Sequence, residues 1–510
     1  MSIEALVQKI RKKVKTQWWV CIVTVFLLGM FAHGYRLTNS MTNWDGLINE
    51  YSSQNMAHVG RIFLTVACGI SSYYELPWLN GLLSLIFISF ISILVTEIFE
   101  MKNHLSRILI SGLLVTFPVI TSTLTYIYTA DGYLLGALLV TAAVWLVQRN
   151  KNGWIPAGLL IFAGFGIYQA YAAWAAMLFL LAGIWKLFLK NIPVKDTLIF
   201  LGKGLLSGIM GAVLYYLAVQ AVISFGGVSL DGYQGVAEIY AFSEINLDYS
   251  LKQCALRFLE FFFGKGDKVN LYVILNILVF LLILLWTFKK IIVKKVYKDH
   301  PRMALCIILG ALFPVACFAL YLIGPYVDYH MLMCLGTSGV YLYLILLMEN
   351  TEFAEERKKI RTEWGAAFLL ALIIYNFIVI ANISYHKLEM SYDRAMNIIT
   401  RMADRLEQAD GWEECENLAV LGRLEETKEY SVDFPPEITG ITEHLVIREN
   451  FNVQAMLQNY ADLHKKDASE EEKLRILDSG EYEKMKSWPE KESVKILGKT
   501  AVIKLGDYEP

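Results

Sequence analysis

Residues 152–185, NGWIPAGLLIFAGFGIYQAYAAWAAMLFLLAGIW, form the longest uncharged stretch of the chain and decide how it folds. A single membrane-spanning helix needs about 20 apolar residues, so this stretch is too long for one span. Gly164, Gly166 and Gln169 lie near its middle. We therefore expect two short helices joined by a tight turn.

Nine further stretches are uncharged and long enough, or nearly so, to cross a bilayer: Thr16–Tyr35, Leu76–Thr96, Ile108–Ala130, Gly132–Gln148, Gly204–Leu230, Val269–Phe288, Met303–Val327, Tyr329–Met348 and Trp364–His386. Together they predict an all-α polytopic membrane protein with about 11 transmembrane helices. Only 18% of the 510 residues are charged. A water-soluble protein carries about 25%, so a soluble enzyme is excluded.

The distribution of charge predicts the orientation. Residues 1–384 hold 29 Lys+Arg and 21 Asp+Glu, a net charge of +8. With 11 spans and a cytoplasmic N-terminus, 23 of these 29 basic residues fall in cytoplasmic loops, as the positive-inside rule requires. Counting 152–185 as one span would place the basic run from Lys289 to Arg302 outside. The long loops 36–75 and 231–268 and the C-terminus are then extracytoplasmic, in a multi-pass protein of the cell membrane.

Residues 385–510 differ from the transmembrane module that precedes them. They hold 17 Lys+Arg and 27 Asp+Glu, so 44 of 126 residues are charged and the net charge is −10. Helical spacing from Leu388 to Leu406 predicts an amphipathic helix that continues the last span. Short apolar runs at 418–421, 493–497 and 501–505 predict strands, and 452–463 predicts another helix. We expect a small extracytoplasmic α/β domain, which either covers the outer face, recognises an acceptor or only stabilises the protein.

The first outer loop combines groups suited to a lipid-linked substrate. It carries Asp45 in Asn-Trp-Asp-Gly, then Glu50, then Arg61, and an amphipathic run at Ile62–Tyr74 that could lie on the membrane. A carboxylate can take a proton from an attacking hydroxyl, and a cation can stabilise a phosphate. The alternative is that Asp45 caps a loop helix or pairs with Arg61.

A second acidic residue, Asp131, follows Tyr128 in Tyr126-Ile-Tyr-Thr-Ala-Asp-Gly. We place it in the tight turn between the third and fourth spans, on a wet surface lined by tyrosines. Asp-Gly is also ordinary turn chemistry, which is the alternative explanation.

Four other polar residues are candidates for binding substrate. Asp328 and His330 stand in a short outer turn and could equally be solvated there. Gln169 is polar at membrane depth, where it reaches a substrate or bonds a neighbouring helix. Arg257 lies in an aromatic interfacial segment, where it clamps a phosphate or only extends its charge to water.

These motifs, in this order, resemble the type II Gtr glucosyltransferases, relatives of the serotype-converting enzymes that glucosylate bacterial O-antigen. The resemblance rests on Asn43-Trp-Asp-Gly46 with Gly60-Arg61, on Tyr128-Thr-Ala-Asp131 and on Gly166-Ile-Tyr-Gln-Ala170, and it covers most of residues 20–385. It implies a GT-C fold, an undecaprenyl-phosphate glucose donor and inversion at the anomeric carbon. It also implies that Asp45 is the catalytic carboxylate and Asp131 a second one.

The resulting hypothesis is a bacterial membrane glycosyltransferase. It would pass a hexose, expected to be glucose, from a polyprenyl-phosphate sugar to a cell-surface glycan. In this scheme Arg61 and Arg257 bind the donor phosphate, and other polar side chains bind substrate: Glu50, Tyr128, Gln169, Asp328 and His330. We expect no cofactor and no nucleic acid partner, and the seven cysteines show no metal-ligand spacing. A transporter of lipid-linked sugars is the alternative, although no internal repeat supports it.

Overall fold

The computed structural model describes residues 15–230, 246–264, 270–350, 356–424, 437–441, 445–447 and 449–506. The chain divides into two compact units. Unit 1 comprises Met1–Asn39, Ser53–Asn382 and Phe434–Thr439, and unit 2 comprises Ser40–Ser52, Ile383–Asp433 and Gly440–Pro510. The first outer loop is therefore shared between the two units, a division that the sequence did not suggest.

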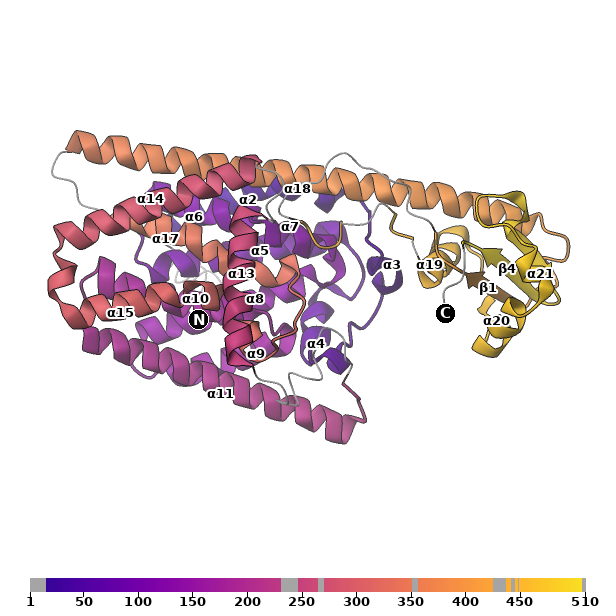
Figure 1. Ribbon diagram of the computed structural model, residues 1–510, viewed down its shortest axis with the longest axis horizontal. Coiled ribbons are helices and arrows are strands. Elements are labelled where there is room, and N and C mark those ends of the chain that lie inside the picture. The colour runs from indigo at the N-terminus through magenta and orange to yellow at the C-terminus, as the bar shows by residue number, and fades with distance from the viewer. Residues whose placement is uncertain are drawn as a thin grey trace, which may run out of the picture. The chain divides into compact units, whose positions relative to one another are not determined.

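Unit 1 is a bundle of helices (Figure 1). Its longer helices are α2 (Thr16–Thr38), α5 (Pro77–Ile98), α6 (His104–Thr116), α7 (Pro118–Thr125), α8 (Ile127–Arg149), α9 (Trp154–Ile167), α10 (Tyr171–Ile184), α11 (Val194–Gly226), α13 (Leu247–Phe263), α14 (Leu271–Val293), α15 (His300–Ala311), α17 (Gly339–Asn350) and the first part of α18 (Glu356–Glu407). Within the described residues, nine helical segments are long and apolar enough to cross a membrane. Two shorter apolar helices, α9 and α15, overlap parts of the other two predicted spans.

The long uncharged stretch is broken as its composition predicts. Helix α9 ends at Ile167, Tyr168 is extended with φ −157° and ψ 112°, and α10 starts at Tyr171. Small residues let these helices approach their neighbours closely. A Cβ atom on Gly164 of α9 would lie 2.6 Å from Cγ2 of Val140 on α8. The break and the close approach place residues 168–171 against the first turns of α8.

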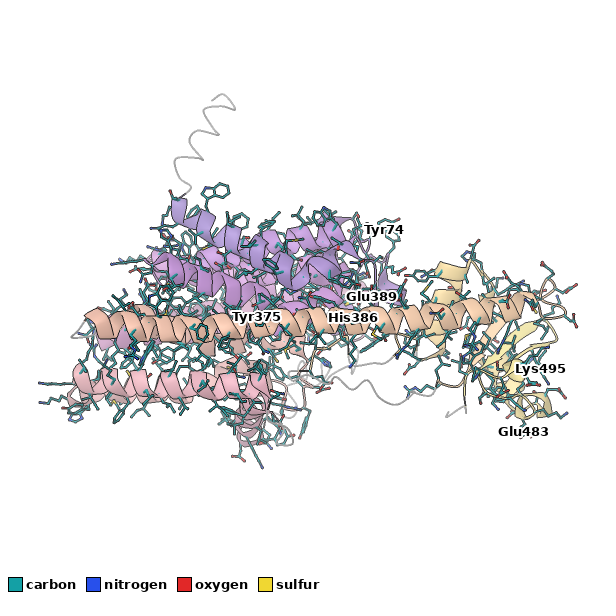
Figure 2. All side chains as sticks on the ribbon, turned by 90° about the horizontal axis from the view of Figure 1, so that it is seen from above. Tyr74, Tyr375, His386, Glu389, Glu483 and Lys495 are labelled. Atoms are coloured by element: carbon teal, nitrogen blue, oxygen red, sulfur yellow. The ribbon has the colours of Figure 1, made fainter. Side chains whose placement is uncertain are left out.

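Short elements complete unit 1 between the long helices. The first outer loop forms η1 (Ala57–Val59), α4 (Leu64–Cys68) and η2 (Gly69–Ser71). Val66 of α4 and Ile70 of η2 are more than half exposed, and Tyr74, which follows η2, is half exposed (Figure 2). This exposure fits the amphipathic run predicted there. A π-helical turn follows α10 at Trp185–Leu189, and α16 (Phe313–Cys317), η6 (Ala319–Leu322) and η7 (Met331–Ser338) connect α15 to α17.

Unit 2 contains a small mixed sheet with helices packed on it. The strands β1 (Asn417–Leu421), β2 (Lys466–Asp467), β3 (Val494–Leu497) and β4 (Thr500–Lys504) are ordered β2-β1-β4-β3. β1 is parallel to β2 and β4, and β3 forms the predicted antiparallel hairpin with β4. The helical elements are α3 (Gly46–Asn49), the end of α18, α19 (Asn450–Ala461), α20 (Glu470–Leu477), α21 (Gly480–Glu483) and η8 (Lys491–Ser493).

The long helix α18 changes character along its length. Its first part exposes large apolar side chains, among them Phe368 and Tyr375, as a helix in contact with lipid would. Beyond Asn382 its exposed surface is polar, and His386 approaches Glu389 at 3.4 Å (Figure 2). The predicted apolar stripe is buried there, since Leu388, Ala395, Ile399, Met402 and Leu406 are each at most 2% exposed.

Candidate active site

Arg61 lies against two stacked tyrosine rings in unit 1. Its Nη1 donates a hydrogen bond of 2.8 Å to the hydroxyl of Tyr133, and its guanidinium carbon lies 5.0 Å from the ring centroid of Tyr168. The rings of Tyr133 and Tyr168 are stacked, with centroids 4.6 Å apart. A guanidinium over aromatic faces keeps its charge and its planar set of donors, which suit a phosphate. The site thus combines a fixed cation with aromatic surface.

Three hydrogen bonds tie the loop that carries Arg61 to the helices. The backbone N–H of Phe63 donates to the carbonyl of Gly166 at 2.8 Å, and Nε2 of Gln169 donates to the carbonyl of Val59 at 2.7 Å. Tyr215 on α11 donates from its hydroxyl to the carbonyl of Gly60 at 3.0 Å. Gln169 therefore bonds a neighbouring segment of the chain, which is the structural alternative that its sequence position left open.

The sequence led us to expect Asp131 in a turn, but the structure places it in a helix. The chain turns at Tyr126, and Asp131 lies in the second turn of α8 with 1% of its surface exposed. Oδ1 accepts a hydrogen bond of 3.1 Å from Asn80 in the first turn of α5, and Asn80 also donates to Ser71 Oγ at 3.0 Å. Among the described residues Asp131 thus lies on no exposed, tyrosine-lined surface of the kind predicted, and Tyr128 beside it is buried as well.

His330, in the other outer turn, interacts electrostatically with Arg61. His330 is half-buried in the loop before η7, and burial lowers its pKa below the ordinary value. The charge of Arg61 lowers this pKa further, while Asp328 and Glu437 oppose the shift. The neutral form of His330 is therefore favoured, and His330 lies within electrostatic range of the cation in the candidate site.

Arg257 on α13 is connected to the same outer turn through Tyr321. Its Nε donates to the hydroxyl of Tyr321 at 3.2 Å, and its Nη1 forms an ion pair of 3.0 Å with Glu260. The exposed Asp328 also acts electrostatically on Tyr321. Lys265 and Lys268, which share this outer loop in the sequence, lie outside the described residues.

Asp45 and Glu50 belong to unit 2. Asp45 is half-buried at the N-cap position of α3, although its side chain makes no capping hydrogen bond. Its backbone carbonyl accepts a hydrogen bond of 2.8 Å from Asn49 Nδ2. Glu50 Oε1 accepts a hydrogen bond from the hydroxyl of Tyr460 on α19.

Sequence reasoning missed an ion pair at the base of the first outer loop. Arg36, at the end of α2, is fully buried, and its Nη2 lies 2.9 Å from Oε1 of Glu75, which is also buried. The remaining donors of Arg36 bond the carbonyls of Leu124 and Asn39. The signal available in the sequence was a pair of opposite charges at the two ends of one outer loop.

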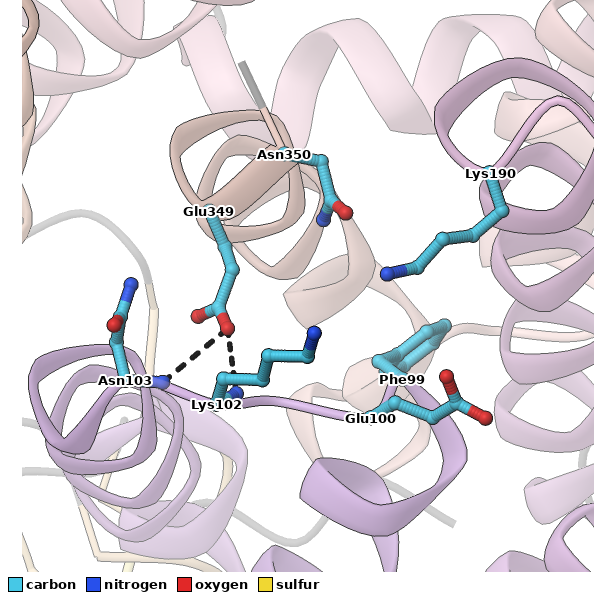
Figure 3. Close-up of a pocket in the computed structure, with 7 residues that line it drawn as sticks. All are labelled: Phe99, Glu100, Lys102, Asn103, Lys190, Glu349 and Asn350. Atoms are coloured by element: carbon cyan, nitrogen blue, oxygen red, sulfur yellow. Dashed lines mark hydrogen bonds between the residues drawn. The ribbon is translucent and has the colours of Figure 1, made fainter. Parts of the chain in front are cut away.

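Two cavities of unit 1 lie outside this cluster. A polar pocket of about 190 Å³ is lined by Phe99, Glu100, Lys102, Asn103, Lys190, Glu349 and Asn350 (Figure 3). Glu349 accepts hydrogen bonds there from the backbone N–H groups of Lys102 and Asn103, so it caps the start of α6. The pocket follows the last residue of α5, roughly 30 Å along that helix from Asn80. None of the predicted site residues lines it.

The second cavity is an apolar groove of about 380 Å³. It is lined by side chains from α10, the π-helical turn Trp185–Leu189, α13, α14, α15, α16 and α17, among them Phe258, Phe280 and Phe313. Leu284 and Ile307 on its lining are more than half exposed, so the groove opens on the surface of the bundle. Phe258 of the groove lining follows Arg257 directly in the chain.

A family model described as Glucosyl transferase GtrII matches residues 34–348, more than half of the chain. The chain belongs to the GtrII glucosyltransferase family. The match contains the first outer loop, the Arg61 cluster and Asp131, and it ends before α18. Membership in the GtrII family, together with the apolar helices, makes the protein a multi-pass membrane glycosyltransferase. Comparisons with curated proteins and with solved structures give no match.

Metal ligands do not gather in the part of the chain that the structure describes. There, no group of three or more His, Cys, Asp or Glu side chains is arranged to hold a metal ion. The six described cysteines of unit 1 and Cys415 of unit 2 are free thiols.

Proposed function

We propose that this GtrII glucosyltransferase moves glucose from undecaprenyl phosphate to a cell-surface glycan, on the outer face of the cytoplasmic membrane and with inversion. The observation that carries the proposal is Arg61 held against Tyr133 and Tyr168. A guanidinium suits the phosphate of the donor, and the two buried rings hold the guanidinium in place. The cytoplasmic position of the N-terminus and the extracytoplasmic position of unit 2 form part of this proposal.

The apolar groove supports a lipid-linked donor over a soluble nucleotide sugar. Its lining is hydrocarbon apart from a few groups such as Thr287 and Tyr343, which bond each other at 3.1 Å. An isoprenoid chain can pack against this lining as it packs among lipid tails, whereas a nucleotide would meet few polar partners there. Arg257, next to the groove in the chain, would then bind the phosphate with Arg61.

The proposed reaction is a single displacement. The acceptor hydroxyl oxygen attacks the anomeric carbon, the bond from that carbon to the phosphate oxygen breaks, and undecaprenyl phosphate leaves with the bonding electrons. Asp45 takes the hydroxyl proton as general base, and the cation stabilises the charge that develops on the phosphate. Attack opposite to the leaving group inverts the configuration.

The other predicted residues receive roles that fit their surroundings. Asp131 is buried beside Asn80. Because Asp131 lies two residues before Tyr133, we assign to it the role of fixing the start of α8, so that acceptor and donor are held in position. Gln169 holds the Arg61 loop. Glu50, Tyr128, Asp328 and His330 remain predicted to contact substrate, directly or through these groups.

The experiment uses the full chain purified in mild detergent. Native mass spectrometry identifies bound lipid, and the protein is then incubated with synthetic undecaprenyl-phosphate glucose, galactose or mannose and with octyl glycosides as acceptors. We expect glucose transfer by the parent, and a loss of about 10²–10⁴-fold in Asp45→Asn with the donor still bound. NMR of the product gives the anomeric configuration.

A matched control is Asp393→Asn, which removes an exposed carboxylate on α18 and should leave transfer unchanged. Full activity in Asp45→Asn would overturn the base assignment. Failure to bind or use any undecaprenyl-phosphate hexose would overturn the donor class. Asp131→Asn tests the second assignment: a positioning role predicts a lower kcat together with a lower melting temperature.

A further inference from the structure

Unit 2 contains, besides the C-terminal domain, a segment from the first outer loop. Residues 40–52, the first-loop segment, belong to unit 2, while the residues on both sides belong to unit 1. The segment is well buried there: Met41, Thr42, Asn43 and Leu47 are each at most 2% exposed. A polar Asn with no exposed surface indicates a fixed position, and Asn43 Oδ1 accepts from the backbone N–H of Gly46 at 2.9 Å.

Helix α19 holds this segment from one face. Asn452 Nδ2 donates to the carbonyl of Trp44 at 3.0 Å, and Asn459 Nδ2 donates to the carbonyl of Leu47 at 3.3 Å. The hydroxyl of Tyr460 donates to Glu50. Positions 452, 459 and 460 are seven and eight residues apart, so they lie on the same side of a helix. Helices α3 and α19 lie side by side in Figure 1.

The hydrogen bonds enclose Asp45. Trp44 precedes Asp45 in the chain and Leu47 follows it by two residues, and both backbone carbonyls are bonded by α19. Bonds to the main chain on both sides of a residue fix the position and direction of its Cα–Cβ bond. Helix α19 also packs on β1, and its apolar residues Val453, Met456 and Leu457 have no exposed surface. The sheet therefore supports the helix, and the helix supports the loop.

We propose that α19 is a positioning element for the glycosyl transfer, with Asn452, Asn459 and Tyr460 as positioning residues that act through Asp45. The C-terminal unit then supplies part of the catalytic apparatus, because it fixes the carboxylate that takes the proton. This inference rests on the proposed role of Asp45. A general base is effective only within about 3 Å of the proton it removes, so a loosened segment lowers kcat.

The test compares full-length variants of α19. Asn452→Ala/Asn459→Ala and Tyr460→Phe remove the hydrogen bonds, and Gln454→Ala is the matched control. Gln454 lies on the opposite side of α19, and no hydrogen bond joins it to the described residues of the first-loop segment. Hydrogen exchange of residues 40–52, the melting temperature, and kcat and KM with undecaprenyl-phosphate glucose and an octyl glycoside are measured for each variant.

We expect the double variant to exchange faster at residues 40–52 and to lose about tenfold or more in kcat, since two hydrogen bonds are removed. KM for the donor and the melting temperature should stay close to those of the parent. The pH dependence of kcat should also shift, because a mobile carboxylate is more solvated. Gln454→Ala should match the parent in every measurement.

The outcomes separate this inference from the proposed function. If Asp45→Asn is inactive and the α19 variants exchange faster but keep full kcat, the positioning role is overturned while the transfer reaction stands. A lower melting temperature with kcat unchanged overturns the positioning role too, in favour of a purely structural one. If Asp45→Asn is fully active, the base assignment and this inference both fail, whatever the exchange rates show.

Discussion

The two halves of the first outer loop are held by different parts of the chain. Residues 40–52 are bonded by α19 of unit 2, through Asn452 and Asn459. Residues 53–75 are bonded by the bundle of unit 1, where Gln169 holds the carbonyl of Val59. One loop thus presents a carboxylate supported by the C-terminal unit and a cation supported by the bundle.

This difference shows that residues close together in the sequence can be held in place by different parts of the chain. Asp45 and Arg61 are 16 positions apart, yet Trp44 bonds a side chain 408 positions away and Arg61 bonds one 72 positions away. If the halves are independent, changes in one should leave hydrogen exchange in the other unaltered. The predictions below test this independence.

The largest effect on stability is expected from the ion pair between Arg36 and Glu75, which closes the loop that contains both halves. Arg36→Met removes the cation from the buried side chain of Glu75, which should cost about 3–5 kcal/mol of stability. Both halves should then exchange faster, and the melting temperature in detergent should fall. Arg36→Met/Glu75→Leu, which removes both charges, should recover most of the loss. A single variant as stable as the parent would show that the pair does not hold the loop.

A smaller effect is expected from the second half alone. Arg61→Gln removes the charge over Tyr168, and we expect KM for the donor to rise about 10–100-fold, as for loss of a charged hydrogen bond. Arg61→Lys keeps the charge and should lose less. Exchange at residues 40–52 should not change in either variant. Faster exchange there would mean that the two halves are coupled.

A still smaller effect on the KM for the donor is expected when the hydroxyl group of Tyr133 is removed. Tyr133→Phe deletes the acceptor of the 2.8 Å bond from Arg61 and keeps the stacked ring. We expect about 1 kcal/mol, or roughly fivefold, in donor KM. Steady-state kinetics measures this effect, with Tyr216→Phe, on α11, as a tyrosine control from another helix. A loss as large as that of Arg61→Gln would show that the hydroxyl, and not the cation, contacts the donor.

The smallest effect is a dependence on pH. Burial lowers the pKa of His330 in the folded protein, so the unfolded chain binds the proton more readily. The stability contributed by neutral His330 is complete above the unfolded value of about 6.5 and is lost as the pH falls below it. Melting temperatures at pH 7.5 and 5.5 should therefore differ slightly more for the parent than for His330→Gln. If the melting temperatures of the parent and of His330→Gln differ equally between these two pH values, His330 does not contribute to the pH dependence.

Local signals predicted several elements of the fold. The break in residues 152–185 follows from glycines and a polar residue inside an apolar run, and the β3–β4 hairpin follows from two short apolar runs around Gly498-Lys499. The GtrII family was also recognised from short motifs around Asp45, Asp131 and Gln169. In each case the decisive residues are neighbours in the chain.

The features that could not be predicted depend on contacts between distant residues. Asp131 lies in α8, where Asn80, 51 positions earlier, bonds its carboxylate, whereas Asp-Gly by itself favours a turn. The support of Asp45 by α19 likewise has no local signature, since Asn452 is an ordinary polar residue in its own helix. Orientation in the membrane and the roles of the site residues remain predictions.

The buried ion pair between Arg36 and Glu75 has a consequence for how the loop can change in length. The pair closes a loop whose ends are 39 positions apart. Doubling the length of such a loop adds only about 0.6 kcal/mol to the entropy of closing it. Residues inserted at a position of this loop that neither α19 nor the bundle holds should therefore cost little, and the start of α5, where Asn80 meets Asp131, should keep its place.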